Sequence, residues 1–251
     1  MLVGIFLIVL LLLILGGMAI AFAMGITSLL VVAVDRGIGN LPFGMIAQRM
    51  VYGVNSFPLL AIPFFLLAGR LMNTAGITDR IFNFCNALIG HVRGGLGHVN
   101  ILASMIFAGM SGSAVSDAVG LGQIELKAMK DQGYDDEFSA AVTAASSTIG
   151  PIIPPSIPMV LYGVLGNVSV GALFIGGIVP GVLMGLFMMA TVTVIAKRRN
   201  YPVQARARFL QIFRATAKAL FPLFCPLILI GGIWSGVFTP TEAAAVAVVY
   251  S

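Results

Sequence analysis

The feature that most constrains this chain is a cluster of prolines inside an apolar region. Residues 147–159 read STIGPIIPPSIPM, with prolines at positions 151, 154, 155 and 158. Proline lacks a backbone N–H and clashes with the preceding turn, so an undisturbed helix cannot pass through this stretch. The flanking runs, EFSAAVTAASS and MVLYGVLGNV, are nevertheless apolar and helix-like. The sequence therefore predicts a broken helix over residues 138–165.

Composition places this broken helix in a lipid bilayer. The 251 residues are 59% hydrophobic and only 9% charged, whereas soluble domains carry about 25% charged residues. Lipid offers no hydrogen bonds to the backbone, which favours helices throughout. The net charge of +5 lies mostly in short segments between apolar runs, a pattern typical of membrane orientation rather than of nucleic-acid binding. We expect an all-α polytopic membrane protein.

The first part of the chain supplies further candidate spans. Residues 1–34 carry no charge and are too long for a signal-peptide core, so we expect a long transmembrane helix there, in which Gly16 and Gly17 allow a kink or a second short helix. Residues 43–54, FGMIAQRMVYGV, predict an amphipathic arm. Two spans follow, at 56–72 and 81–92, joined by a polar loop. With the N-terminus outside, most Lys and Arg residues lie inside, including the basic surface segment 197–218, and only Arg70 and Arg80 fall outside.

A second break precedes the prolines. The runs NILASMIFAGM and VSDAVGLGQIELKAMK are each apolar for too short a distance to cross a bilayer, which takes about 20 residues. The small residues of GMSGSAVSDA, 109–118, separate them. Two half-length helices with a small-residue tip predict a re-entrant hairpin over residues 98–130.

Paired helix breaks at membrane depth indicate a transporter binding site. Helix N-termini offer free N–H groups and partial positive charge to an anion. Unwound carbonyls and the hydroxyls of Ser111 and Ser113 offer oxygen ligands to a small cation. Either break taken alone is equally explained as a structural kink, because Gly, Ser and Pro are common in membrane helices.

Three polar residues have open roles, two of them at these breaks. An acid at the bilayer centre costs about 2.5–3.5 kcal/mol, so Asp117 either contacts a ligand or binds the backbone of its own hairpin. Ser156 is likewise a substrate-adjacent or structural candidate. Glu242 begins a helix with Thr239 or Thr241 as its cap, which favours a structural role.

Catalytic function is disfavoured. The segments GGLGHVN and GLGQIELK resemble glycine-rich phosphate loops, but neither follows a strand or precedes the Lys-Ser/Thr pair that such loops need. The sequence has no paired carboxylates, no Cys-His pair and no histidines at metal-ligand spacing. We expect that the protein is not an enzyme.

Several segments together resemble a known family. They are FAGMSGSAVSDAVGLG, AAVTAASSTIGPIIPPSIPMVLYGVL, GGIVPGVLMG and GIWSGVFTPTEAAAVAVVY. These stretches resemble the large membrane subunit of tripartite ATP-independent periplasmic (TRAP) transporters, the DctM-like family, and the resemblance covers essentially the entire chain.

The resemblance implies a bacterial inner-membrane permease that imports organic acid anions, such as C4-dicarboxylates or sugar acids, with sodium as the coupling ion. Its implied partners are a small four-helix membrane subunit and a periplasmic substrate-binding protein. It also implies an elevator-type fold of two inverted repeats. The first sodium site would comprise Ser111, Gly112 and Ser113 with carbonyls around Gly150, Pro151 and Pro154.

The same resemblance divides the chain. Residues 1–97 correspond to scaffold and connecting helices with the amphipathic arm, and 98–165 to a transport-domain element. Residues 166–218 correspond to a membrane helix with the basic cytoplasmic segment, and 219–251 to the start of the second repeat.

One departure from the family pattern concerns length. Family members are roughly twice as long, so half of the binding site lies outside this sequence, and we expect that these residues alone do not transport. The alternatives are a truncated, non-transporting protein that only binds the small subunit, or a channel, since broken helices also line selectivity filters.

Overall fold

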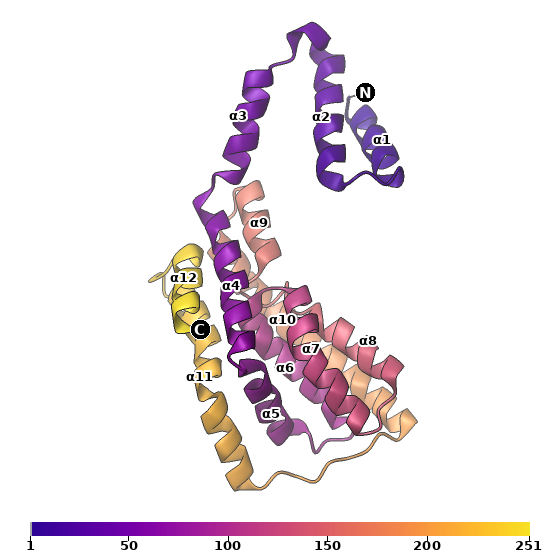
Figure 1. Cartoon of the computed structure of the whole chain (residues 1–251), viewed down its shortest axis with the longest axis vertical. Helices are drawn as coiled ribbons and strands as arrows, with labels where there is room; N and C mark the ends of the chain where they lie inside the picture. Colours follow the sequence, from indigo (N-terminus) through magenta and orange to yellow (C-terminus); the bar gives the residue numbers. More distant parts are fainter. Residues whose placement is uncertain (1) are drawn as a thin grey trace. The chain divides into compact units, whose positions relative to one another are not determined.

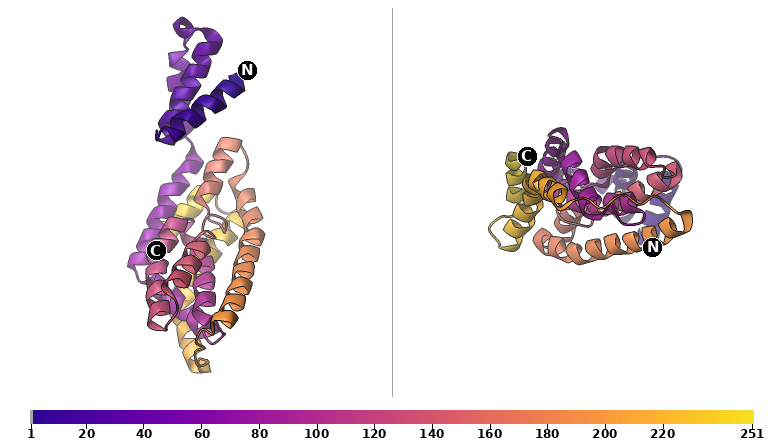
Figure 2. Two further views of the ribbon diagram at one scale, coloured as in Figure 1. Left: turned by 90° about the vertical axis from the view of Figure 1, so that its right-hand side faces the viewer. Right: turned by 90° about the horizontal axis from the view of Figure 1, so that it is seen from below.

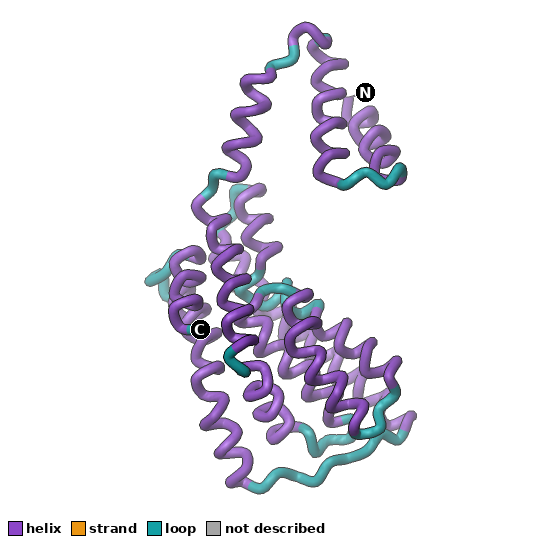
Figure 3. The backbone as a smooth tube through the Cα atoms, viewed as in Figure 1, coloured by secondary structure: helices purple, strands orange, loops and turns teal. Residues whose placement is uncertain are grey.

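The computed structural model describes residues 2–251, which form helices joined by loops and contain no strand (Figure 3). Two compact units are distinguished, residues 1–55 and residues 56–251. The first unit contains α1 (Leu2–Leu15), α2 (Ile20–Arg36), the short 3-10 helix η1 (Ile38–Asn40) and α3 (Phe43–Val54).

The N-terminal apolar run is two helices rather than one long span. Gly17 adopts a φ of 84° between α1 and α2, a backbone conformation that side chains other than glycine rarely tolerate. Of the two alternatives that Gly16 and Gly17 allowed, a kink or a second helix, the structure shows a second helix. The predicted helix over residues 43–54 is confirmed as α3.

The second unit contains the two breaks (Figure 1). Its elements are η2 (Phe57–Leu60), α4 (Ala61–Thr74), α5 (Ile77–Ile89), α6 (Gly95–Ser111), α7 (Ala114–Asp131), α8 (Asp136–Ser147), α9 (Ile157–Gly166), α10 (Val170–Arg199), α11 (Phe209–Trp234) and α12 (Pro240–Tyr250).

Helix α6 is the centre of this unit. Of its 17 residues, 14 are buried, and it packs against α4, α5, α7, α8, α10 and α11. A helix surrounded on every side needs no polar face, which explains the continuous apolar and small-residue sequence ILASMIFAGM. Helix α9 packs mainly against α10 and helix α12 mainly against α4, and the second unit is a bundle of helices that lie side by side (Figure 2).

Three helical segments in the described part of the chain are long and apolar enough to cross a bilayer. They are Phe57–Thr74, which joins η2 to α4, then α10 and α11. The helices α1, α6 and α9 are apolar but shorter. These lengths agree with a multi-pass membrane protein that also contains half-length helices.

The expected position of Arg80 is wrong. Arg80 lines one cavity together with Asp79, Asn83 and Lys218, so Arg80 and Lys218 do not lie on opposite sides of a bilayer. The reason is the path of the chain, because α5 continues below α4 instead of returning beside it (Figure 1). The turn at Ala75–Gly76 interrupts one passage and does not reverse the chain.

The basic segment divides into three parts. The helix α10 extends through Arg199, residues 200–208 form an extended connection, and α11 starts at Phe209. Arg214 and Lys218 are therefore part of a membrane-length helix, unlike the surface location expected for them. The connection is attached to the loop before α8, where Asp135 accepts hydrogen bonds from Tyr201 Oη at 2.6 Å and Arg199 Nη1 at 2.7 Å.

Candidate ion and substrate site

The hairpin tip is built by glycine and serine. Gly112 ends α6 in the left-handed conformation, with a φ of 60°, and its N–H donates to the Ala108 carbonyl at 3.2 Å. Ser113 is extended and caps α7, its Oγ accepting from the Ser116 N–H at 3.3 Å. These are the preferred residue types at a helix C-terminus and N-terminus. The predicted helix–tip–helix arrangement is present, while its entry and exit on one side of the bilayer stays a prediction.

The proline segment separates α8 from α9 through a closed loop. Ser156, which is fully buried, donates from Oγ to the Pro151 carbonyl at 2.5 Å and accepts from the Met159 N–H at 3.2 Å. One side chain thus caps α9 and closes the turn before it. Of the two roles considered for Ser156, the geometry supports the structural one.

The tip and the break lie in direct contact, as their pairing in sequence predicts. The Ile157 N–H donates to the Gly112 carbonyl at 3.4 Å. A Cβ added at Gly150 would lie 3.1 Å from the carbonyl carbon of Ser113 and 3.2 Å from the Ala114 nitrogen. A Cβ at Gly112 would overlap the Pro155 carbonyl oxygen. Glycine at both positions therefore allows the two backbones to touch.

Several oxygens around this contact are free to bind a ligand. Within residues 2–251, the carbonyls of Gly150 and Pro154 accept no hydrogen bond, and the Ser111 Oγ is buried without a partner. Buried polar atoms are nearly always paired, so these oxygens fit the ligand set of a small cation. The Pro151 carbonyl differs, because Ser156 already donates to it.

Asp117 does not bind the backbone of its hairpin. Its side chain is 1% exposed, and neither carboxylate oxygen has a hydrogen-bond partner. The alternative that Asp117 holds the tip rigid through backbone hydrogen bonds is wrong, because Ser113 already serves the first turn of α7. The carboxyl instead lies beside the hydroxyls of Ser104 on α6 and Ser147 on α8.

Sequence reasoning missed the residues that support the site from outside. A Cβ at Gly69 of α4 would lie 3.3 Å from the Ser111 Cβ, and a Cβ at Gly109 would lie 2.9 Å from Pro226 of α11. The only sequence signal was the presence of a small residue at each helix crossing, and such residues are frequent in this chain.

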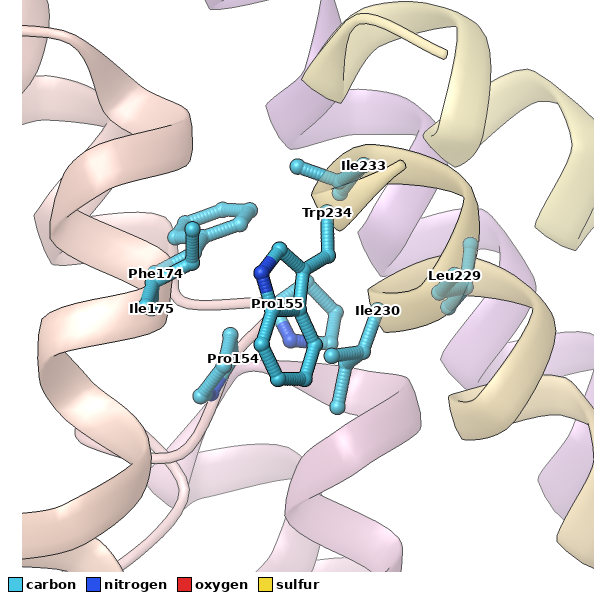
Figure 4. Close-up of a pocket in the computed structure, with 8 residues that line it drawn as sticks. All are labelled: Pro154, Pro155, Phe174, Ile175, Leu229, Ile230, Ile233 and Trp234. Carbon is cyan, nitrogen blue, oxygen red and sulfur yellow. The ribbon is translucent and has the colours of Figure 1, made fainter. Parts of the chain in front are cut away.

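The rear of the break faces an apolar cavity rather than the site. Pro154 and Pro155 line it with Phe174 and Ile175 of α10 and the end of α11, including Trp234 (Figure 4). Its volume of about 10 Å³ is barely that of one water molecule. Apolar walls of this size suit helix packing and do not suit an anion.

The other polar candidates are structural. Thr239 and Glu242 form a capping box at the start of α12, with the Thr239 N–H donating to the Glu242 carboxylate at 2.8 Å. This confirms the capping role, with Thr239 rather than Thr241 as the cap. Among the residues that the structure describes, no group of three His, Cys, Asp or Glu side chains could hold a metal ion.

Comparison with known proteins identifies the family. Residues 7–251 match the family described as tripartite ATP-independent periplasmic transporter, DctM component. The sialic acid TRAP transporter large permease protein SiaM of Vibrio cholerae is 48% identical over 94% of this chain and 55% of its own length. The sialic acid TRAP transporter permease protein SiaT of Haemophilus influenzae is 54% identical over 81% of this chain and 33% of its own.

A relative with a different name matches at a similar level. The C4-dicarboxylate TRAP transporter large permease protein DctM of Pseudomonas aeruginosa is 45% identical over 78% of this chain and 46% of its own length. The chain spans about half the length of two of these relatives and one third of the length of the other. The match over residues 7–251 shows that the chain belongs to the DctM family of TRAP transporter membrane permeases.

Proposed function

We propose that residues 1–251 provide one half of the sodium and substrate site in a TRAP permease that imports an organic acid anion. The sodium ligands are Ser111, Gly112 and Ser113 at the tip, with carbonyl oxygens of Gly150 and Pro154 and, more weakly, Pro151 at the break. The observation that carries the proposal is the direct contact between these two interruptions, through Ile157 and Gly112 at 3.4 Å.

The chemistry of the oxygens supports a hard cation. Sodium, like other hard cations, is bound by oxygen ligands, and the free carbonyls and the unpartnered Ser111 hydroxyl supply them. Proline contributes indirectly, since each one removes an N–H that would otherwise occupy a carbonyl. The unpaired oxygens and the prolines that remove N–H donors therefore lie at the same contact between tip and break.

The helix termini support an anionic substrate. The helices α7 and α9 both begin at the contact, one after Ser113 and the other after Ser156. Two helix N-termini favour a negatively charged group such as a carboxylate. The names of the relatives agree, since they refer to sialic acid, C4-dicarboxylate and 2,3-diketo-L-gulonate.

The proposed partners are a small four-helix membrane subunit and a periplasmic substrate-binding protein, in a bacterial inner membrane. The test reconstitutes these partners in proteoliposomes with a permease that contains residues 1–251. We expect uptake to require an inward sodium gradient, and S111A and S113A to raise the sodium concentration needed. S235A, an exposed serine at the end of α11, is the matched control. Uptake that is unchanged without a sodium gradient contradicts the proposal.

Residues 1–251 alone contain only this half of the site, so we propose that they do not transport by themselves. Expression of this segment with the small subunit tests that statement. Co-purification without uptake supports it, and sodium-driven uptake by the segment alone contradicts it. Electrical conductance without the periplasmic protein would favour the channel alternative.

A further inference from the structure

Polar side chains are buried along α6, α7 and α8, where these helices pack against one another and against their neighbours. Ten are no more than 6% exposed: His98, Asn100, Ser104 and Ser111 on α6, Asp117 and Glu125 on α7, and Ser139, Thr143, Ser146 and Ser147 on α8. Polar groups in such surroundings are costly unless they are paired. A buried polar side chain that is hydrogen-bonded to its neighbours therefore has a structural role, whereas an unpartnered one is a candidate ligand.

One layer of this interface is fully paired. Asn100 donates from Nδ2 to Thr143 Oγ1 at 2.7 Å, and Ser146 donates from Oγ to Asn100 Oδ1 at 2.6 Å. Gly122 of α7 lies directly against Thr143, so the three helices pack tightly there. This layer holds the helices together and leaves no ligand group free.

The layer at Asp117 has the opposite character. Both carboxylate oxygens of Asp117 and the Oγ of Ser104 are buried without hydrogen-bond partners. Ser147 uses its proton to donate to the Thr143 carbonyl at 2.7 Å, which leaves the lone pairs of its oxygen available to a cation. The Asp117 carboxyl lies close enough to the Ser104 and Ser147 hydroxyls to interact with them, so four oxygens from three helices are neighbours without a hydrogen bond between them.

No positive side chain neutralises this carboxylate. The buried residues of the described chain include no lysine and no arginine. Glu125, two turns further along α7, adds a second buried acid rather than a base. An uncompensated buried charge is strongly destabilising, and either a cation from solution or a proton on the carboxyl removes that cost.

We propose that the Asp117 carboxylate, with the hydroxyls of Ser104 and Ser147, binds a sodium ion at a position separate from the hairpin tip. Ser104 lies seven residues before Ser111 on α6, roughly 10 Å along the helix. Asp117 lies one turn beyond Ser113, roughly 6 Å along α7. The choice of sodium rests on the proposed function, whereas the cation site itself rests on the unpaired oxygens.

All three side chains belong to α6, α7 and α8, so binding is measured on residues 1–251 without transport. The experiment measures radioactive sodium bound to the purified chain in lipid nanodiscs, with choline replacing other cations. We expect D117N to bind one sodium fewer per chain. S104A should weaken the affinity of that position by at least about tenfold, the lower range for losing a group that supports a metal site.

A matched control lies on α8. Ser139 is 2% exposed and donates to the Asp135 carbonyl at 2.9 Å, two turns before Ser147, so S139A should leave sodium binding unchanged. In choline, D117N should unfold at a temperature no lower than the unchanged chain, because it removes an unpaired charge. Its sodium-dependent rise in melting temperature should be smaller.

The outcomes separate this proposal from the proposed function. Sodium binding by D117N with unchanged number and affinity overturns the second position. Loss of all sodium binding in S111A/S113A, with no change in D117N, also overturns it in favour of the tip alone. Loss in D117N together with sodium-independent uptake leaves the second position standing and removes the sodium-coupled function instead.

Discussion

Prolines interrupt the chain in one region and are accommodated in another. Residues 148–156 leave helical geometry around Pro151, Pro154 and Pro155, so that α8 and α9 are separate helices. In contrast, Pro222 and Pro226 lie inside α11, which remains continuous over 26 residues. The same residue type in equally apolar surroundings thus has two outcomes.

The difference lies in what packs against the prolines. In α11, Pro226 fits against Gly109 of α6, so the neighbouring helix accommodates this proline while α11 stays continuous. At the break, Ser156 caps a new helix and the tip carbonyl of Gly112 accepts from Ile157. Proline weakens a helix, and the neighbouring groups decide whether it ends.

The largest effect is expected from a substitution that disrupts the contact between the hairpin tip and the proline segment. G112A places a Cβ at a φ of 60° and against the Pro155 carbonyl oxygen. The left-handed conformation alone costs about 1–2 kcal/mol, and the overlap adds to it. We expect the free energy of unfolding in detergent to fall by more than about 2 kcal/mol. G25A is the control, because a Cβ there meets nothing within 4 Å, and equal losses in both variants would contradict the expectation.

The next largest effect is expected from removing one of two helix caps, Ser156 or Ser169. S156A removes the cap of α9 and the link to the Pro151 carbonyl, and should lower the free energy of unfolding by about 1–2 kcal/mol. S169A removes only an exposed cap of α10, which binds the Ala172 N–H at 3.3 Å, and should cost about 0.5–1 kcal/mol. Denaturant unfolding of both variants measures the difference, and a larger loss for S169A would show that the break does not depend on Ser156.

A third test replaces a proline inside a continuous helix. Pro180 is exposed within the 30-residue α10, and P180A restores one helical hydrogen bond. We expect stabilisation of about 1 kcal/mol, less than the roughly 3 kcal/mol that proline costs in soluble helices, because membrane helices tolerate proline better. P154A should give no such gain, since Pro154 lies in the broken segment. Thermal unfolding compares the two, and equal stabilisation would mean that the break is only a weakened helix.

The smallest effect lies outside the membrane, where Asp135 holds residues 200–208 to the loop before α8. The Tyr201 hydroxyl and the Arg199 guanidinium both donate hydrogen bonds to this carboxylate and lower the pKa of Asp135 below its usual value, with the larger contribution from Tyr201. Its contribution to stability is therefore present above the unfolded-state pKa, about 3.9, and is lost as pH falls through the lower folded-state pKa.

The corresponding measurement is thermal unfolding as a function of pH. D135N should remove this part of the acid dependence between about pH 5 and pH 2. D136N is the control, because Asp136 pairs with Lys130 at 3.5 Å through side chains that are 71% and 75% exposed, and such pairs contribute little. A larger change in D136N than in D135N would contradict the assignment.

Much of the site was predictable because its residues have strong local effects. Glycine and serine at 112 and 113 specify a helix end followed by a cap, and prolines at 151–155 exclude a regular helix. Their pairing across one short loop predicted the contact that the structure shows at Gly150 and Gly112. The capping box at Thr239 and Glu242 was predictable for the same reason.

The errors occurred where local sequence leaves the path of the chain open. A polar turn such as NTAGITDR can reverse a membrane helix or merely interrupt it, and only packing against α11 and α6 distinguishes the two. The environment of Asp117 was equally hidden, because Ser104 and Ser147 lie on other helices.

The sequence by itself determined that this is a helical membrane protein with two interruptions, because hydropathy and proline act on the residues that carry them. It also determined the family, through the motifs at those interruptions. Only the tertiary structure decided that α5 continues α4, that Ser156 closes the break, and that Asp117 faces two hydroxyls without a partner. These features depend on contacts between segments distant in the chain, and their geometry follows from how α6 is surrounded.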